Sequence, residues 1–87
     1  MQEIKKVLLN KEGLHARPAG ALAKTAAEFK SKIELQFNQK KVNAKSSLSL
    51  MTLGLTHNSE FIIFADGEDA EMAVKKLSDL VDKEFKL

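Results

Sequence analysis

Hydrophobic and polar residues alternate most regularly over residues 32–37, KIELQF. Three apolar side chains fall on one face of an extended chain and three charged or polar ones on the other, which predicts a half-buried β-strand. Asn38 and Gln39 separate this segment from a second one, residues 40–44, so the pattern predicts a β-hairpin. A tight type I′ turn favours Asn-Gly because both central residues need a positive φ, so Gln39 indicates either a strained turn or a longer one.

Two further segments have the composition of strands. Residues 3–9 are short and aliphatic, but their alternation is imperfect, so they predict a strand without indicating its buried face. Residues 60–65 form a nearly continuous apolar run, which is typical of a central, well-covered strand.

Three other segments repeat their apolar residues with the period of a helix. The first is about residues 16–29, with a face rich in alanine. The second is a short apolar helix that Ser46 or Ser47 can cap and Gly54 can end. The third follows an Asp-Gly turn and has acidic residues near its positive end. Its apolar stripe contains Ala70, Ala73, Val74, Leu77, Leu80 and Val81.

The order of these elements predicts the fold class. Strand, helix, two hairpin strands, short helix, strand and long helix give β-α-β-β-α-β-α. Collecting the helices on one face of a four-stranded antiparallel sheet buries their apolar stripes together. We therefore expect an α+β protein, an open-faced β-sandwich with three helices on one face. The length suits one domain over residues 1–87, without repeats or linkers.

Composition narrows the class of protein. The hydrophobic fraction is 44% and the charged fraction 30%, as in an ordinary globular domain. No apolar run is long enough to span a membrane and residues 1–9 are too polar for a signal peptide, so we expect a cytoplasmic protein without direct membrane insertion. There are no cysteines, and no carboxylate lies at a metal-ligand spacing from His15 or His57. We expect neither a metal site nor a cofactor.

A small α+β domain can also be a nucleic-acid-binding module, so this alternative needs a test. The formal net charge is +2, with lysines concentrated in the first half of the chain, which is a modest excess for such a role. Sheet-based RNA readers stack bases on exposed aromatic side chains, whereas this chain has no Trp or Tyr and its five Phe residues lie in apolar segments. We expect no nucleic-acid partner.

The chemistry of the chain concentrates in residues 13–20, GLHARPAG. This stretch places His15 at the start of the first predicted helix, where backbone amides lack intrahelical partners and carry partial positive charge. Pro18 suits a first turn, because it has no N–H to lose and the carbonyl that its ring opposes lies outside the helix. The residue before a proline avoids helical angles, so Arg17 is either the true start or part of a distorted first turn.

These residues can handle a phosphoryl group. A neutral imidazole is a nucleophile that can carry one covalently, and a guanidinium offers a fork of donors that matches phosphate oxygens. Amides near Ala16 and Arg17 complete the phosphate-binding site, which makes His15 a phosphoryl-acceptor candidate. Two other interpretations stay open: His15 is a solvated or capping residue, or phosphate binds noncovalently to Arg17 and the helix end.

Residues 13–19 resemble the active-site signature of the HPr family, the histidine-containing phosphocarriers of the bacterial phosphotransferase system. The resemblance runs from about Ile4 to Phe85 and includes residues 42–46 and 51–54. It implies the same open-faced fold. It also implies a protein that accepts a phosphoryl group from phospho-enzyme I and passes it to the sugar-specific IIA components. By motif position, the catalytic residues are His15, the carrier, and Arg17, the phosphate-stabilising partner.

A second site is implied at Ser46. In some members of the family this serine is phosphorylated by HPr kinase/phosphorylase, although a serine before a short helix is first of all an N-cap. The family usually continues with isoleucine, methionine and glycine, whereas this chain has Ser47, Leu48 and Ser49, a change at the kinase-docking positions. The alternative function is that of an HPr-like regulatory paralogue, which acts through protein binding and Ser46 phosphorylation.

Partner binding is expected on an apolar rim beside His15. The candidates are Leu14, Leu48 and Met51, with Leu53 a weaker one, and core packing is the competing interpretation for each. The chain itself is expected to be a monomer. It departs from the usual family pattern at Glu12, where a small hydroxyl residue is common, and at Gly20, where a larger residue is usual.

Overall fold

The sheet of the computed structural model has four antiparallel strands in the order β1-β4-β2-β3. The structure describes residues 1–86. Its strands are β1 (Gln2–Val7), β2 (Lys32–Phe37), β3 (Lys40–Asn43) and β4 (Glu60–Asp66). Its helices are α1 (Ala16–Ala26), α2 (Ser47–Met51) and α3 (Ala70–Asp82). The predicted element order is confirmed.

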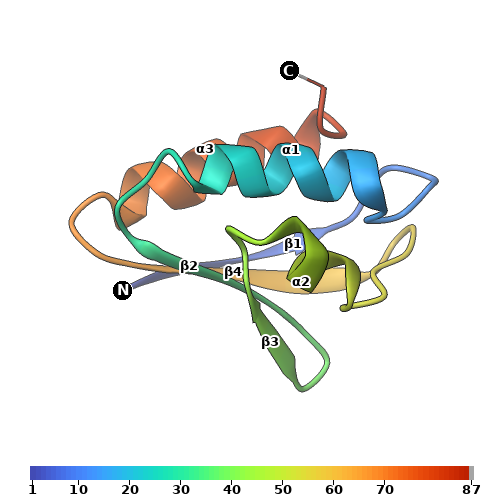
Figure 1. Ribbon diagram of the computed structural model, residues 1–87, viewed down its shortest axis with the longest axis horizontal. Helices are drawn as coiled ribbons and strands as arrows, with labels where there is room; N and C mark the ends of the chain where they lie inside the picture. The colour runs from blue at the N-terminus through green and yellow to red at the C-terminus, as the bar shows by residue number, and fades with distance from the viewer. Residues whose placement is uncertain (87) are drawn as a thin grey trace.

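The helices leave one face of the sheet open. α1 and α3 lie side by side over the sheet, and the short α2 packs against α1 and β3 (Figure 1). Between the helices and the sheet lies a core of aliphatic and aromatic side chains. Members at most 1% exposed include Leu22, Ile33, Leu35, Phe61, Ile63 and Leu77. This arrangement is the predicted open-faced α+β sandwich.

Strand β4 is central, as predicted, but it is covered on one face only. Phe61, Ile63 and Ala65 are buried, whereas Ile62 and Phe64 are half-buried on the opposite face. The expectation of a well-covered strand is therefore wrong for that face, because an antiparallel sheet with all its helices on one side leaves the other side accessible. Lys41 partly covers the open face by placing its Nζ 4.1 Å from the centre of the Phe64 ring.

The β2–β3 turn is neither longer than two residues nor strained at Gln39. Phe37 pairs with Lys40, so the loop contains Asn38 and Gln39 alone. A positive φ, 57°, occurs at Asn38 and not at Gln39. Asparagine tolerates this conformation better than most residues, which explains why no glycine is needed here.

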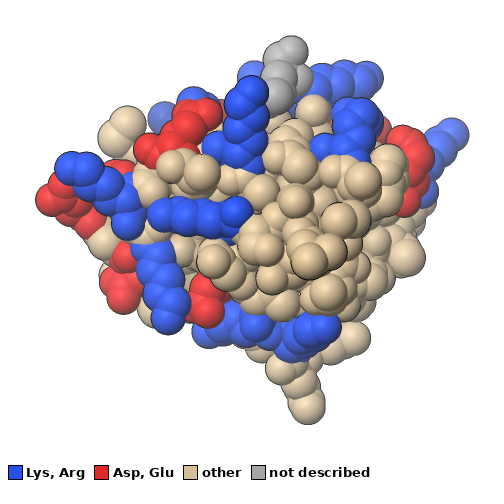
Figure 2. Space-filling view, viewed as in Figure 1, with Lys and Arg blue, Asp and Glu red and all other residues tan. Residues whose placement is uncertain are grey.

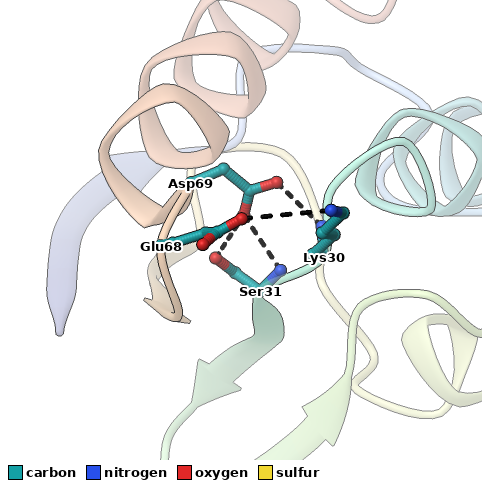
Figure 3. Close-up of polar contacts among 4 residues, drawn as sticks. All are labelled: Lys30, Ser31, Glu68 and Asp69. Carbon is teal, nitrogen blue, oxygen red and sulfur yellow. Dashed lines mark hydrogen bonds and ion pairs between the residues drawn. The ribbon is translucent and has the colours of Figure 1, made fainter.

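At the α1–β2 connection, a carboxylate joins two segments that are distant in sequence. The Asp69 carboxylate accepts hydrogen bonds from the backbone N–H groups of Lys30, at 2.8 Å, and Ser31, at 2.9 Å, and from the Ser31 hydroxyl (Figure 3). The Ser31 hydroxyl and then the Lys30 N–H hold the pKa of Asp69 below its usual value, because both donors favour the ionised carboxylate. We refer to these contacts as the Asp69 bridge.

Candidate functional site

Helix α1 begins immediately after the candidate nucleophile. His15 is its N-cap residue with extended backbone angles, φ −92° and ψ −164°, and its carbonyl accepts the first helical bond from the Ala19 N–H at 2.9 Å. Arg17 and Pro18 lie inside the first turn, so the helix starts before Arg17 rather than at it. Pro18 fits there because the carbonyl that its ring would meet, that of Leu14, precedes the helix.

The side chains of the site are accessible. His15, Ala16 and Arg17 are all exposed. His15 is solvated and occupies the N-cap position, but its side chain makes no capping hydrogen bond. Among residues 1–86, Arg17 takes part in no ion pair. Both the imidazole and the guanidinium are therefore available to a reacting partner.

The start of α1 supplies further donors. The N–H groups of Ala16 and Arg17 belong to the first turn, where backbone amides have no intrahelical acceptor. They lie at the positive end of the helix dipole, which favours an anion such as a phosphoryl group. Two backbone donors and one guanidinium thus follow His15 directly in the chain.

Tight backbone packing holds the segment before His15. Gly13 has φ +77°, and a Cβ at this position would lie 2.7 Å from the Leu55 carbonyl oxygen. The next residue, Leu14, donates its N–H to the same carbonyl at 3.0 Å, and its side chain is 5% exposed. Leu14 is therefore a core residue, and the prediction that it binds a partner is wrong, since its side chain is occupied inside the molecule.

The other predicted docking residues divide between surface and core. Leu48 is 72% exposed and Met51 is 37% exposed, whereas Leu53 is buried. We call Leu48 and Met51 the docking patch. α2 packs against α1, and Figure 2 shows a broad uncharged surface over α2 and the adjoining part of α1.

Ser46 is the N-cap of α2. Its Oγ accepts a hydrogen bond from the Ser49 N–H at 3.2 Å, so the capping interpretation is confirmed. The residue is half-buried. Phosphorylation of Ser46 stays a prediction.

One polar residue near the site escaped sequence reasoning. Asn10 lies in the β1–α1 connection, is 3% exposed, and donates its side-chain N–H to the Gly13 carbonyl at 2.6 Å. An asparagine three residues before a glycine is a turn signal, but it does not show that the side chain is buried. Over the described part of the chain, no group of three or more His, Asp or Glu residues could hold a metal ion.

Comparison with known proteins identifies the family of the chain. The family model described as "PTS HPr component phosphorylation site" matches residues 2–83. The phosphocarrier protein HPr of Mycoplasma capricolum is 39% identical over 77 residues, which cover 88% of this chain and 86% of that protein.

Solved structures agree with this match. A crystal structure of HPr from Thermoanaerobacter tengcongensis superposes with a TM-score of 0.94 at 42% identity, covering 100% of both chains. The catabolite repression protein Crh of Bacillus subtilis, described as a swapped dimer, gives 0.78 at 38% identity, also over 100% of both chains.

The open-faced sandwich with an exposed histidine at the start of its first helix defines a class of small phosphoryl-carrier domains. The chain belongs to the HPr family, the phosphocarriers of the phosphotransferase system.

Proposed function

We propose that His15 is the phosphoryl carrier of this protein. Its Nδ1 attacks the phosphorus held on the phosphohistidine of enzyme I. The new N–P bond forms as the bond to the donor histidine breaks. A second transfer moves the group from His15 to a IIA component and regenerates the free imidazole. The observation that carries this proposal is the His15 side chain itself, which is exposed at the N-cap of α1 without any capping hydrogen bond.

Arg17 and the amides of Ala16 and Arg17 stabilise the charge on the transferring group. Phosphoryl transfer depends mainly on positioning and electrostatic stabilisation, which donors aimed at the equatorial oxygens supply. A carrier must also release its cargo, so these groups must favour the transition state over the phosphorylated state. Exposure of the site lets both the donor and the acceptor protein reach the imidazole.

The proposed partners are enzyme I and IIA components, which dock on the surface that includes Leu48 and Met51. We place this reaction in the cytoplasm and expect the chain, as one HPr-like domain, to act as a monomer. Among the described residues, no helix has the length and apolar composition needed to cross a membrane.

The test follows the phosphoryl group from enzyme I to this protein and then to a IIA component. The protein is phosphorylated with enzyme I and phosphoenolpyruvate, separated from enzyme I, and mixed with a IIA component. Loss of the phosphoryl group from this protein with equal gain on IIA is the expected result. A phosphorylated form that never discharges to any IIA component would contradict the carrier role.

A regulatory role through Ser46 is the second candidate. Two observations favour it: the likeness to Crh and the position of Ser46 beside the exposed Leu48 at the start of α2. A phosphate there adds charge beside the docking patch and repels a partner with an acidic or apolar surface. Incubation with HPr kinase/phosphorylase and ATP, with Ser46→Ala as control, tests this role.

A further inference from the structure

The connection that carries His15 contains a buried polar side chain that the proposed transfer chemistry does not use. Asn10 makes two bonds across a single turn. Its Nδ2 donates to the Gly13 carbonyl at 2.6 Å, and its own carbonyl accepts the Gly13 N–H at 3.3 Å. Both polar groups of the Gly13 main chain are thus engaged by one residue.

The opposite side of Gly13 is equally constrained. A Cβ there would lie 2.7 Å from the Leu55 carbonyl oxygen and 3.2 Å from Thr56 Cα, so the loop before β4 presses directly on the turn. The Leu14 N–H is bonded to that same carbonyl. The main chain two residues before His15 is therefore held between Asn10 and the Leu55–Thr56 segment.

This packing matters because the His15 imidazole has no capping hydrogen bond of its own. Its position follows from the main chain on either side of it. On the helical side, the Ala19 N–H fixes the His15 carbonyl at 2.9 Å. On the other side, the Asn10–Gly13 bonds perform the same task.

The buried Asn10 side chain is not one that stability of the fold alone would favour at this position. Its Oδ1 is buried, and no donor within residues 1–86 pairs with it. A buried acceptor without a partner is destabilising, which offsets the gain from the hydrogen bond that Nδ2 makes. Removing the side chain removes the unpaired acceptor but leaves the buried Gly13 carbonyl without its donor, so the rate of transfer and the global stability must be measured separately.

We propose that Asn10 is a positioning residue for phosphoryl transfer at His15. It holds the Gly13 carbonyl and thereby fixes the direction from which the imidazole meets the phosphorus atom. This inference rests on the proposed carrier function of His15. Asn10 touches neither the imidazole nor the transferred group, so its effect is on geometry alone.

The test compares Asn10→Ala with Asn43→Ala. Asn43 is a matched control, because its side chain also bonds a nearby backbone group, the Lys45 N–H at 2.9 Å, but at the end of β3. Asn10→Ala should lower kcat/KM for phosphorylation by enzyme I roughly tenfold to hundredfold, the scale for misplacing a reacting group by about 1 Å. Asn43→Ala should leave it unchanged.

Phosphoramidate separates positioning from reactivity. This small phosphoryl donor can approach an exposed imidazole from any direction, so its reaction rate with His15 should be the same in the wild type and in Asn10→Ala. An equal loss of rate with phosphoramidate and with enzyme I would overturn the positioning role. A loss of rate with enzyme I that is explained by lower stability of Asn10→Ala, seen as a lower midpoint of urea unfolding, would also overturn it.

Amide hydrogen exchange gives a readout that is independent of enzyme I. Asn10→Ala should speed the exchange of the Gly13 and Leu14 amides while the strand amides of β4 keep their protection. Unchanged exchange at Gly13 and Leu14 would overturn the proposal. If the wild type accepts no phosphoryl group from enzyme I, the carrier function fails, and the exchange measurement still decides whether Asn10 holds this loop.

Discussion

At the residue scale, the site depends on what the backbone permits at a few positions. Gly13 is constrained, with φ +77° and no room for a Cβ, whereas Gly20 lies inside α1 and a Cβ there would meet nothing within 4 Å. The two glycines therefore respond oppositely to the same substitution. The sequence places Gly13 before the first helix and Gly20 inside it, but only the structure shows that a Cβ at Gly13 has no room.

Gly20→Ala should stabilise the protein. Glycine in a helix interior costs about 0.5–1 kcal/mol relative to alanine, and the structure offers no clash to offset that gain. Gly13→Ala should destabilise it, because the new methyl group meets the Leu55 carbonyl. Urea unfolding of both variants measures the two effects. A loss of stability in Gly20→Ala would contradict the packing described for α1.

Arg17 should contribute through the geometry of its guanidinium and not only through its charge. Arg17→Gln is expected to slow phosphorylation of His15 by roughly 10²-fold, the scale for removing one aimed donor from a transition state. Lys24→Gln removes the same formal charge from an exposed position on the same helix and serves as the control. Stopped-flow rates with phospho-enzyme I make the comparison. Equal losses in the two variants would indicate long-range attraction in place of direct contact.

At the element scale, α2 supplies the docking patch and α3 secures the far end of α1. α2 is short, with five residues, and keeps its geometry through the Ser46 cap and contacts to α1 and β3. α3 reaches the α1–β2 connection through the Asp69 bridge (Figure 3). Function and stability should therefore respond to different helices.

Leu48→Ser should weaken docking without weakening the fold. Replacing an anchor residue of an interface commonly costs more than 1 kcal/mol of binding, or about fivefold in affinity, whereas an exposed position changes stability by less than about 0.5 kcal/mol. The KM for enzyme I is expected to rise accordingly. Met72→Ser is the matched control, since Met72 is 68% exposed on α3. The same KM in Leu48→Ser and wild type would remove Leu48 from the docking surface.

The Asp69 bridge should make stability fall in acid. The pKa of Asp69 is lower in the folded state than in the unfolded state. The contribution of its carboxylate to the stability of the fold is therefore complete above the unfolded-state pKa of about 3.9, and it is lost as the pH falls through the lower folded-state pKa. Asp69→Asn should therefore be less stable than the wild type at neutral pH, and the difference should shrink below about pH 4. Urea unfolding from pH 7 downward measures it. Glu68→Gln, which removes a neighbouring exposed carboxylate that is not part of the Asp69 bridge, is the control variant.

At the scale of the whole molecule, periodicity predicted the architecture well. Each helix and strand occurs where its pattern indicated, with ends that differ by a few residues: β1 ends at Val7 instead of residue 9, and α1 ends at Ala26 instead of residue 29. The period of the apolar residues shows which face of each helix is apolar, and this is sufficient to place α1 and α3 on a shared core. It does not show how many faces of a sheet are covered, so the sequence wrongly predicts that Ile62 and Phe64 are well covered.

The candidate site was predictable where it depends on local sequence and not where it depends on packing. The position of His15 at a helix start follows from the residues around it. The burial of Leu14 and the tight packing at Gly13 depend on Leu55 and Thr56, which are some forty residues away in the chain. Contacts at that separation leave no local pattern, so only the structure distinguishes a docking residue from a core residue here.

The central claim is that His15 carries a phosphoryl group. The most direct measurement is intact-mass analysis after incubation with enzyme I and phosphoenolpyruvate, carried out on the wild type and on His15→Ala. A single acid-labile phosphoryl adduct on the wild type and none on the variant is the predicted result. An adduct that persists in His15→Ala, or no adduct under conditions that fully charge a known HPr, would contradict it.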